Sequence, residues 1–221
     1  RNIGVPQFGT EMRLVPFGDK YEVRLKGPHI TPGYWKDKVN TKKSFDNEGF
    51  FKIGDALKFK DKLNPEKGFY FDGRIAENFK LNTGTWVSVG NVRSKLLDAL
   101  GGIVIDAIIV GEDQEYLSAF LIPNIAFCSS LLNLNTQDSE EKILSHQILK
   151  NKILEILTSY KNNNHSKSQY IKKVVFFKGV LSKAKGEITD KGSINQIKFI
   201  LNRDQLVKKL FTNQLKDIIS L

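Results

Sequence analysis

The sequence predicts an α+β fold, with a small antiparallel β-unit followed by an α+β domain that has a small sheet flanked by helices. Up to about residue 73, short apolar–polar alternations are separated by turn residues, which is typical of antiparallel strands. After Arg74, helical periodicity alternates with short apolar runs, which indicates one small sheet covered by helices. The 221 residues, 40% of them hydrophobic, suffice for a real core. We expect two domains, residues 1–75 and residues 76–221.

The first domain is expected to consist of short strands joined by tight turns. Alternation predicts strands over Met12–Val15 and Tyr21–Leu25, and Gly18-Asp19 between them is a hairpin signal. Two further polar turns precede aromatic strands, namely Asp46–Gly49 before Phe50 and Lys62–Gly68 before Phe69–Phe71.

The second domain is expected to combine helices with buried strands. Gly90–Leu100 carries its apolar residues on one helical face, and the glycines at 101 and 102 end that helix. The other expected elements are the strands Ile103–Val110, Tyr116–Ile122 and Ile171–Phe177 and the helices Gln137–Tyr160 and Asp204–Ile219. No Gly/Ser-rich linker separates the domains, so we expect a hinge of a few residues close to 74–77.

Cysteine content and hydropathy exclude several classes of protein. The single cysteine, Cys128, excludes an internal disulfide framework and a cysteine-based metal cluster, and it indicates a reducing, cytoplasmic setting. No apolar run approaches the length of a membrane span. His29, His146 and His165 lack the partner spacing of a metal site or a catalytic triad. We therefore expect no metal site and no membrane span.

The net charge of +10 is concentrated near the C-terminus. Residues 161–221 hold 13 Lys/Arg against 4 Asp/Glu, whereas the remainder holds 21 against 20. A basic region favours anionic partners such as nucleotide phosphates, CoA or nucleic acid, although a solvated lysine-rich surface gives the same composition. Aromatics interleaved with lysines over Tyr170–Lys178 permit an alternative function, a non-catalytic nucleic-acid- or protein-binding module. That segment also alternates like a buried strand.

Four polar segments are candidates for chemistry. Asp55 follows Gly54 and could accept hydrogen bonds from a diol, or lie in an ordinary turn. Arg74 follows Gly73 and could bind a nucleotide through its planar fork, or be a surface arginine. Gly84 lies in a polar turn between two apolar runs, which indicates a hairpin whose glycine permits close backbone approach to a ligand. The fourth segment, Lys183–Gln196, is a basic loop with several lysines.

The order of these segments resembles adenylate-forming enzymes, the acyl-CoA synthetase superfamily, and most closely its feruloyl-CoA synthetase-like branch. Phe51–Asp55 fits the Tyr/Phe-x-x-Gly-Asp turn of that superfamily, and Gly73-Arg74 fits its Gly-Arg motif. Phe79–Val87 resembles the run Phe-Lys-Leu-x-x-Gly-Thr-Trp-Val of the branch. Residues 186–192, followed by Ile194–Gln196, resemble its Gly-Glu-Ile-Thr-Asp-Lys-Gly and Ile-Asn-Gln.

The resemblance implies a role for each segment. Asp55 and Arg74 would bind the ribose of ATP, and Lys191, with Lys183 and Lys185 as reserves, would stabilise charge on the α-phosphate. The glycine loop would enter the active site for thioester formation, through the residues Lys80, Gly84, Thr85 and Trp86.

The sequence also departs from the superfamily's pattern. The usual hinge aspartate is replaced by Ala76 with Glu77 after it, which leaves the identity of the hinge residue open. Glu187 occupies the place of the motif lysine when Gly186 is aligned on the motif glycine. Phe8–Glu11 imitates an adenine-binding element, but its neighbours match the segment after that element, so Glu11 is interpreted as structural.

By the same resemblance, the chain is expected to be the C-terminal portion of an acyl-CoA synthetase. Residues 1–75 would be the last β-subdomain of the large adenylation domain, and residues 76–221 the mobile C-terminal domain. The parent would use ATP, CoA and magnesium to activate a small-molecule carboxylate, such as a hydroxycinnamate. The phosphate loop, acyl pocket and metal ligands would lie upstream of Arg1, so this chain alone is expected to be inactive.

Overall fold

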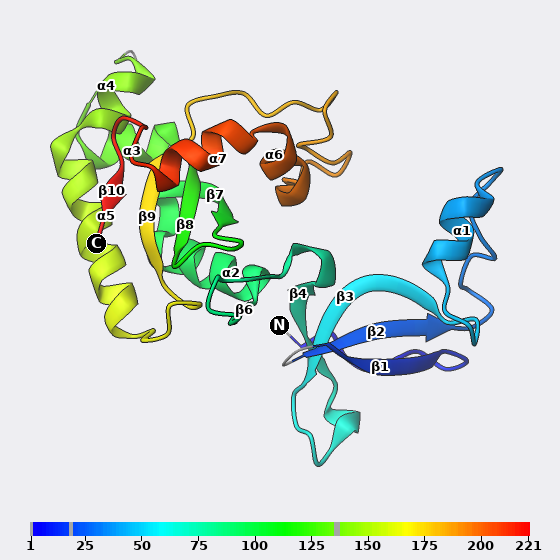
Figure 1. Cartoon of the computed structure of the whole chain (residues 1–221). Helices are drawn as coiled ribbons and strands as arrows, with labels where there is room; N and C mark the ends of the chain where they lie inside the picture. The colour runs from blue at the N-terminus through cyan, green and yellow to red at the C-terminus, as the bar shows by residue number, and fades with distance from the viewer. Residues whose placement is uncertain (1, 18–19, 135–137) are drawn as a thin grey trace. The chain divides into compact units, whose positions relative to one another are not determined.

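The computed structural model describes residues 2–17, 20–134 and 138–221. The chain forms two compact units, Arg1–Asn78 and Phe79–Leu221 (Figure 1). The expected turn at Gly18-Asp19 lies outside the described residues. In the described part of the chain, no helix has the length and apolar character needed to cross a membrane.

The first unit is an antiparallel four-stranded sheet in the order β1-β2-β3-β4. Its strands are β1 (Glu11–Phe17), β2 (Lys20–Lys26), β3 (Phe51–Phe59) and β4 (Phe69–Arg74). Because side chains alternate along a strand, Val23, Leu57 and Phe69 meet on one face and form a small core. A short helix that the sequence did not predict, α1 (Lys38–Ser44), is capped by Asp37, whose carboxylate accepts from the Asn40 N–H.

The second unit contains a mixed sheet in the order β10-β9-β8-β7. Its strands are β7 (Val104–Val110), β8 (Leu117–Pro123), β9 (Ile171–Phe176) and β10 (Ile219–Ser220). Strands β8 and β9 are parallel, and the other neighbouring pairs are antiparallel. A separate hairpin of β5 (Phe79–Lys80) and β6 (Trp86–Val87) precedes this sheet.

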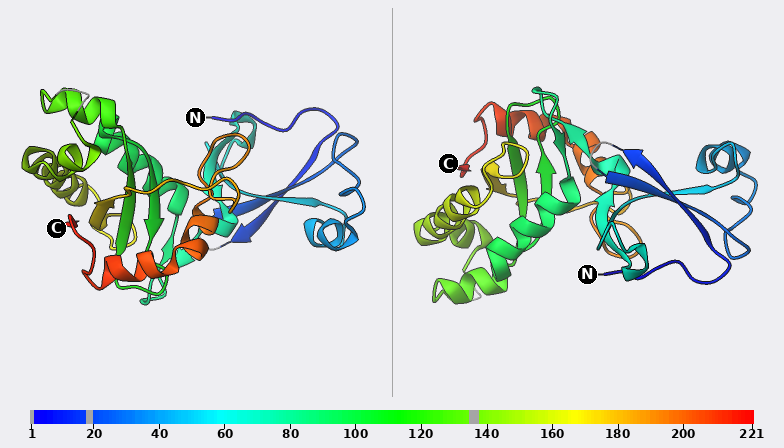
Figure 2. Two further views of the ribbon diagram at one scale, coloured as in Figure 1. Left: turned by 90° about the horizontal axis from the view of Figure 1, so that it is seen from above. Right: turned by 90° about the horizontal axis from the view of Figure 1, so that it is seen from below.

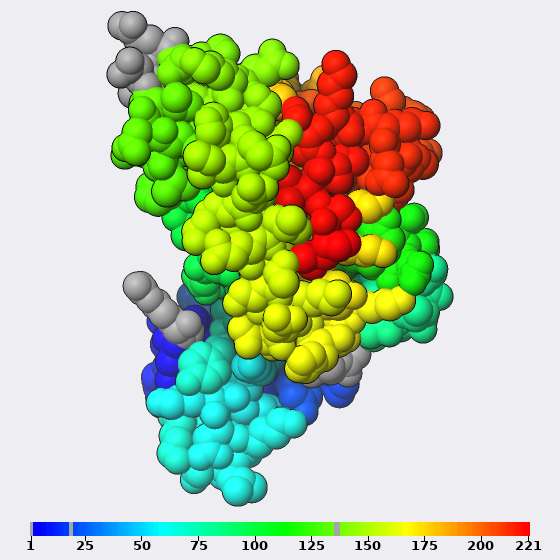
Figure 3. Space-filling model, turned by 90° about the vertical axis from the view of Figure 1, so that its left-hand side faces the viewer, coloured from blue at the N-terminus to red at the C-terminus, as the bar shows by residue number. Residues whose placement is uncertain are grey.

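Helices cover both faces of this sheet (Figure 2). One face packs on α2 (Val89–Leu100), α3 (Ile125–Leu131), α4 (Glu140–Ser145) and α5 (Gln147–Asn162). The other packs on α6 (Gln196–Asn202) and α7 (Asp204–Phe211). Strand β7 shows the alternation, since Ala107 and Ile109 face the first group while Ile108 and Val110 face the second. Helix α5 covers much of the surface shown in Figure 3. The α+β prediction is confirmed.

The prediction of a single helix over Gln137–Tyr160 is wrong. The chain forms α4 and α5, separated at His146, whose ψ of 130° is extended. The His146 Nδ1 atom accepts a hydrogen bond from the Ile148 N–H at 3.3 Å, so this residue caps the second helix. Gln137 itself lies outside the described residues.

The expected helix Asp204–Ile219 is also too long. Helix α7 ends at Phe211, and Asn213 and Asp217 then adopt positive φ of 59° and 62°, which a helix cannot contain. The Asp217 carboxylate accepts hydrogen bonds from Lys150 and Lys178, and residues 219–220 pair with β9 as an edge strand. Long-range contacts therefore replace the last turns of the predicted helix.

Candidate functional site

Asp55 and Arg74 lie side by side in the first unit. They are direct partners across strands β3 and β4, and the Arg74 Nε and Asp55 Oδ1 atoms are 3.9 Å apart. That distance is a charge contact rather than a hydrogen bond. The Arg74 side chain is 62% exposed and the Asp55 side chain is 35% exposed, so a ligand can reach both. One negative and one positive group thus share a small solvent-accessible area.

Glycine residues shape the backbone at this pair. The sequence placed Asp55 in a turn at a strand end, whereas it lies inside β3, at an irregularity in the pairing with β4. Gly54 has φ of +78° and Gly73, before Arg74, has φ of +88°. Only glycine adopts such angles without strain, and a bulge changes the direction of neighbouring side chains.

Asp55 also lines an apolar cavity of about 260 Å³. Much of the cavity's lining is provided by apolar side chains of the same unit, among them Val23, Leu57, Phe69 and Phe71. Burial raises the pKa of Asp55 and outweighs the opposing effect of Arg74. A planar apolar group could lie in this cavity while its hydroxyl groups meet the carboxylate.

The two expected hinge residues lie in a single turn. Ile75–Glu77 forms a 3₁₀ turn, closed by the Asn78 N–H donating to the Ile75 carbonyl at 3.2 Å. The turn holds both Ala76 and Glu77, and it ends two residues before the second unit begins at Phe79.

The glycine loop is a hairpin, as the sequence predicts. Strands β5 and β6 pair through Phe79 with Val87 and Lys80 with Trp86. Gly84 has φ of +78° and has no atom within 4 Å of the position of an added Cβ. The hydroxyls of Thr83 and Thr85 are 3.0 Å apart beside it.

The base of the hairpin is firmly attached to the second unit. Phe79, Leu81 and Val87 are buried in the main core. The Asp113 N–H donates to the Lys80 carbonyl and the Asn82 N–H donates to the Gln114 carbonyl, each at 3.0 Å. The Lys80 Nζ atom lies 4.9 Å from the centre of the Trp86 ring. An exposed glycine tip is therefore carried on a rigid base.

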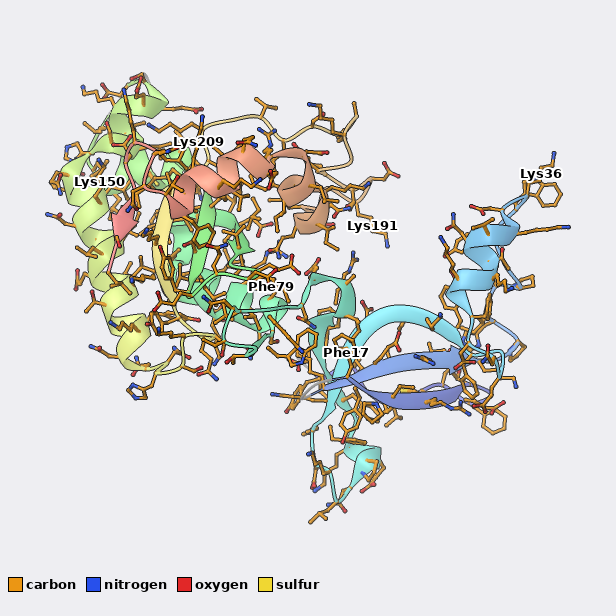
Figure 4. All side chains as sticks on the ribbon, viewed as in Figure 1. Phe17, Lys36, Phe79, Lys150, Lys191 and Lys209 are labelled. Carbon is orange, nitrogen blue, oxygen red and sulfur yellow. The ribbon has the colours of Figure 1, made fainter. Side chains whose placement is uncertain are left out.

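The basic loop presents its lysines outward. Ile188 and Ile194 form a β-bridge, and a turn above it is closed by the Gly192 N–H donating to the Thr189 carbonyl at 2.8 Å. Lys191 lies in that turn and is exposed, pointing into solvent (Figure 4). Lys183 and Lys185 are exposed as well.

Glu187, in contrast, points into the fold. Its side chain is 1% exposed, and its carboxylate pairs with Arg203, with Nε–Oε1 and Nη2–Oε2 distances of 2.9 and 2.8 Å. Glu187 therefore does not offer a charge to a ligand in the place of a lysine. The sequence reasoning missed Arg203, because nothing local links two residues sixteen positions apart.

Three other kinds of group are candidates for a site: metal ligands, the cysteine thiol and aromatic side chains for nucleic-acid stacking. Within residues 2–17, 20–134 and 138–221, no group of three or more His, Cys, Asp or Glu side chains could hold a metal ion. Burial raises the pKa of the Cys128 thiol to about 11, so this thiol is a core group. Phe176 and Phe177, in the segment considered for nucleic-acid binding, are 5% and 7% exposed and offer no stacking face.

The chain is similar to curated acyl-activating enzymes. It is 25% identical over 175 residues to "Probable acyl-activating enzyme 16, chloroplastic" of Arabidopsis thaliana, a match that covers 72% of this chain and 24% of the relative. It is 26% identical over 147 residues to "Long-chain-fatty-acid–CoA ligase 1" of Homo sapiens, covering 66% and 20%. It is 39% identical over 66 residues to "Probable 4-coumarate–CoA ligase 2" of Dictyostelium discoideum, covering 30% and 10%. No family model matches the chain.

Solved structures share the fold. The adenylation domain of a carboxylate reductase from Mycobacterium chelonae gives a TM-score of 0.69 at 18% identity, covering 92% of this chain and 31% of that one. The A domain of carboxylic acid reductase from Segniliparus rugosus, in complex with AMP and a co-purified carboxylic acid, gives 0.68 at 18% identity, covering 97% and 31%. The chain thus spans about a quarter or less of these curated relatives and about a third of these structures. Its homologues and structural neighbours are adenylate-forming enzymes, namely acyl-CoA synthetases and the adenylation domains of carboxylic acid reductases.

Proposed function

We propose that this chain is the C-terminal portion of an AMP-forming acyl-CoA synthetase. In the first half-reaction a substrate carboxylate attacks the α-phosphorus of ATP, the bond to the β-phosphate breaks, and pyrophosphate leaves. In the second, the CoA sulfur attacks the acyl carbon and AMP leaves, while the thiol proton passes to solvent. The observation that carries the proposal is the Asp55–Arg74 pair, adjacent across two strands and accessible beside an apolar cavity.

The pair suits the ribose of ATP. A carboxylate accepts hydrogen bonds from two neighbouring hydroxyls, and a charged acceptor makes these bonds stronger than a neutral one. The Arg74 guanidinium has several N–H donors, and its 3.9 Å separation from Asp55 leaves room for a ligand oxygen to join them. The adjoining apolar cavity suits a nucleoside that is apolar on its faces and polar at its edge.

Lys191 is proposed to assist adenylation. As the carboxylate attacks, negative charge develops on the α-phosphate, and an ammonium group held nearby stabilises that charge in the transition state. The position of Lys191 in the turn of residues 189–192, where its side chain is exposed, supports this role. Lys183 and Lys185 are the alternatives in the same loop.

The β5–β6 hairpin is proposed to serve the thioester step. Open space surrounds the position of an added Cβ at Gly84, so an extended thiol substituent can pass close to the backbone there. Lys80 and Trp86 flank the tip, and the lysine lies over the ring. The pair thus offers a cation and an apolar surface to the phosphate-bearing and alkyl parts of CoA.

The division of labour implies motion. We assign residues 1–75 to ribose binding and residues 76–221 to a mobile domain that brings either the basic loop with Lys191 or the hairpin to the nucleotide. Ala76 and Glu77, in the 3₁₀ turn near the end of the first unit, are the proposed hinge. Magnesium is proposed to accompany ATP, and its ligands are proposed to lie in the rest of the intact protein, since among the described residues no group of three or more His, Cys, Asp or Glu side chains could hold a metal ion.

The proposed acid is aromatic, such as a hydroxycinnamate. The motif resemblance to the feruloyl-CoA synthetase-like branch supports it, as does the relative named a probable 4-coumarate–CoA ligase. The relative named a long-chain-fatty-acid–CoA ligase favours a fatty acid instead.

The test uses the intact protein that carries this sequence. It is incubated with ATP, magnesium, CoA and a panel of hydroxycinnamic, benzoic and long-chain fatty acids, and acyl-CoA products are identified by mass spectrometry. We expect acyl-CoA from at least one aromatic acid, together with AMP. Formation of products only from fatty acids would contradict the substrate assignment, and absence of any acyl-CoA or acyl-adenylate would contradict the function. The 221-residue chain by itself is expected to release no pyrophosphate above a buffer control.

A further inference from the structure

Glu187 is the best-bonded side chain in the basic loop. Its Oε1 atom accepts from the Arg203 Nε at 2.9 Å and the Asn202 Nδ2 at 3.4 Å. Its Oε2 atom accepts from the Arg203 Nη2 and the Ser182 backbone N–H, each at 2.8 Å. A buried carboxylate needs such partners, because burying an unpaired charge is costly.

The backbone of Glu187 connects the two sides of the same loop. Its N–H donates to the Ser182 carbonyl at 2.9 Å, and its carbonyl accepts from the Asn195 N–H at 2.8 Å. We call residues 182–195 the lysine loop. The two ends of this loop, Ser182 and Asn195, are thus joined by backbone hydrogen bonds to the same residue, Glu187. The turn that carries Lys191 lies beyond this closure, between Ile188 and Ile194.

Arg203 is held as firmly as the residue it binds. It lies at the junction of α6 and α7, and its guanidinium carbon is 4.7 Å from the centre of the Phe177 ring. Its Nη2 atom also donates to the Val180 carbonyl at 2.8 Å, just before the loop begins. Asn202 adds a bond to the Lys185 carbonyl at 3.1 Å. Asn202 and Arg203, at the junction of the two helices, therefore hold the loop through several hydrogen bonds.

We infer that Glu187 and Arg203 are a positioning pair that fixes the lysine loop in one conformation and so determines where Lys191 is presented. The use of Lys191 in adenylation rests on the proposed function, whereas the ordering of the loop does not. A long loop with several exposed lysines would otherwise sample many conformations, and each would lower the fraction of molecules with the ammonium group in place. The pair removes that freedom without touching a ligand.

The loop's order can be measured on the chain itself. Amide hydrogen exchange is followed by mass spectrometry in the 221-residue chain and in its Glu187→Gln, Arg203→Lys and Asn202→Ala variants. We expect residues 182–195 to exchange roughly tenfold faster or more in Glu187→Gln, which loses a charge-assisted bidentate interaction. Arg203→Lys keeps the charge but not the fork, so a smaller acceleration is expected. Residues 171–176 in β9, which lie in the core, exchange through opening of the whole unit and report its overall stability separately.

A matched control removes another bidentate pair of the second unit. Asp106→Asn breaks the Arg93–Asp106 interaction, whose Nε–Oδ1 distance is 2.7 Å, and should leave exchange in residues 182–195 unaltered. Unchanged exchange of the lysine loop in Glu187→Gln would overturn the inference. If that variant unfolds the whole unit, Asn202→Ala decides, because it leaves no buried charge unpaired; it should still speed exchange in the loop, and its failure to do so would overturn the inference.

A second readout separates this inference from the proposed function. In the intact protein, Glu187→Gln should lower kcat of adenylation, leave KM for ATP nearly unchanged, and spare thioester formation from a supplied acyl-adenylate. If Lys191→Ala proves silent while Glu187→Gln still loosens the loop, the lysine assignment fails and the positioning pair stands. If Glu187→Gln leaves hydrogen exchange of the loop unchanged while Lys191→Ala slows adenylation, the positioning pair is wrong and the lysine assignment stands.

Discussion

Asp55 shows how backbone, charge and burial act together at one residue. The left-handed Gly54 before it and the irregular β3–β4 pairing aim its carboxylate toward Arg74 and the apolar cavity. The resemblance to adenylate-forming enzymes predicts both residues as ribose ligands, but it does not predict that they are partners in one ladder. A bulge shifts the register of the β3–β4 pairing locally, and this shift cannot be predicted from the hydrophobic periodicity of either strand.

Lys191 is the residue on which the first half-reaction is proposed to depend. Replacing Lys191 by Ala in the intact protein removes one charge-stabilising donor, so adenylation should slow roughly a hundredfold or more, or by about 3 kcal/mol. Thioester formation from a supplied acyl-adenylate should be largely spared. Both half-reactions are followed by rapid quench, with Lys198→Ala, an exposed lysine of α6, as the matched control.

Variants of Lys183 and Lys185 can contradict the assignment of Lys191. Loss of adenylation in Lys183→Ala or Lys185→Ala, with Lys191→Ala silent, would move the catalytic role within the loop. Silence of all three variants would remove the role from this loop altogether.

Glu187 makes the stability of the second unit depend on pH. The hydrogen bond from Arg203 and other contacts outweigh burial and lower the pKa of Glu187 from 4.5 to about 2. Because the folded pKa is depressed, the stabilisation is fully present above the unfolded pKa and is lost as pH falls toward the folded pKa. Between about pH 5 and about pH 2, the free energy of unfolding should fall by on the order of 3 kcal/mol more in the wild type than in Glu187→Gln.

Urea titrations of the 221-residue chain at a series of pH values measure that difference. Effects of other carboxylates, such as Asp217, are common to both proteins and cancel in the comparison. Parallel curves of stability against pH would show that Glu187 has no depressed pKa in the folded chain.

At the scale of elements, the β5–β6 hairpin combines a buried base with an open tip. Gly84→Trp should block passage of the CoA arm and slow thioester formation by at least tenfold, while adenylation stays largely intact. Nothing lies within 4 Å of the added Cβ, so the first atom of the new side chain meets open space, although the φ of +78° costs about 1–2 kcal/mol. Gly84→Ala carries the same backbone strain without the bulk and is the matched control.

Equal loss of thioester formation in the two Gly84 variants would attribute the effect to the backbone rather than to a blocked passage. Equal loss of both half-reactions in Gly84→Trp would show that the hairpin is not specific to the second step.

Element prediction succeeded where the signal is local. The hairpin, the strands β7 to β9 and helix α2 follow from periodicity and turn residues, and Gly101, with φ of 55°, ends α2 as expected. The two failures have different causes, one local and one distant. The single helix predicted over 137–160 is interrupted by the cap at His146, and the helix predicted over 204–219 stops before the bonds from Lys150 and Lys178 to Asp217.

At the scale of the whole molecule, the two units have separate cores of very different size. Three buried side chains form the core of the first sheet, whereas the second sheet is covered by helices on both faces. Leu121→Ala, at a fully buried position of β8, should therefore destabilise the second unit by about 2–5 kcal/mol and leave the first unchanged. Hydrogen exchange of both sheets in the 221-residue chain checks this. Faster exchange throughout β1–β4 in the variant would show that the units unfold as one.

The central claim is that the intact protein adenylates a carboxylate with Asp55 as a ribose ligand. The most direct test is carboxylate-dependent exchange of labelled pyrophosphate into ATP, comparing wild type, Asp55→Asn and the control Asp61→Asn, which alters another aspartate of the same unit. We predict exchange in the wild type and control, and a decrease in Asp55→Asn of roughly tenfold or more at subsaturating ATP, because a charged acceptor is lost. Absence of exchange with every acid, or equal exchange in Asp55→Asn and wild type, would contradict the account.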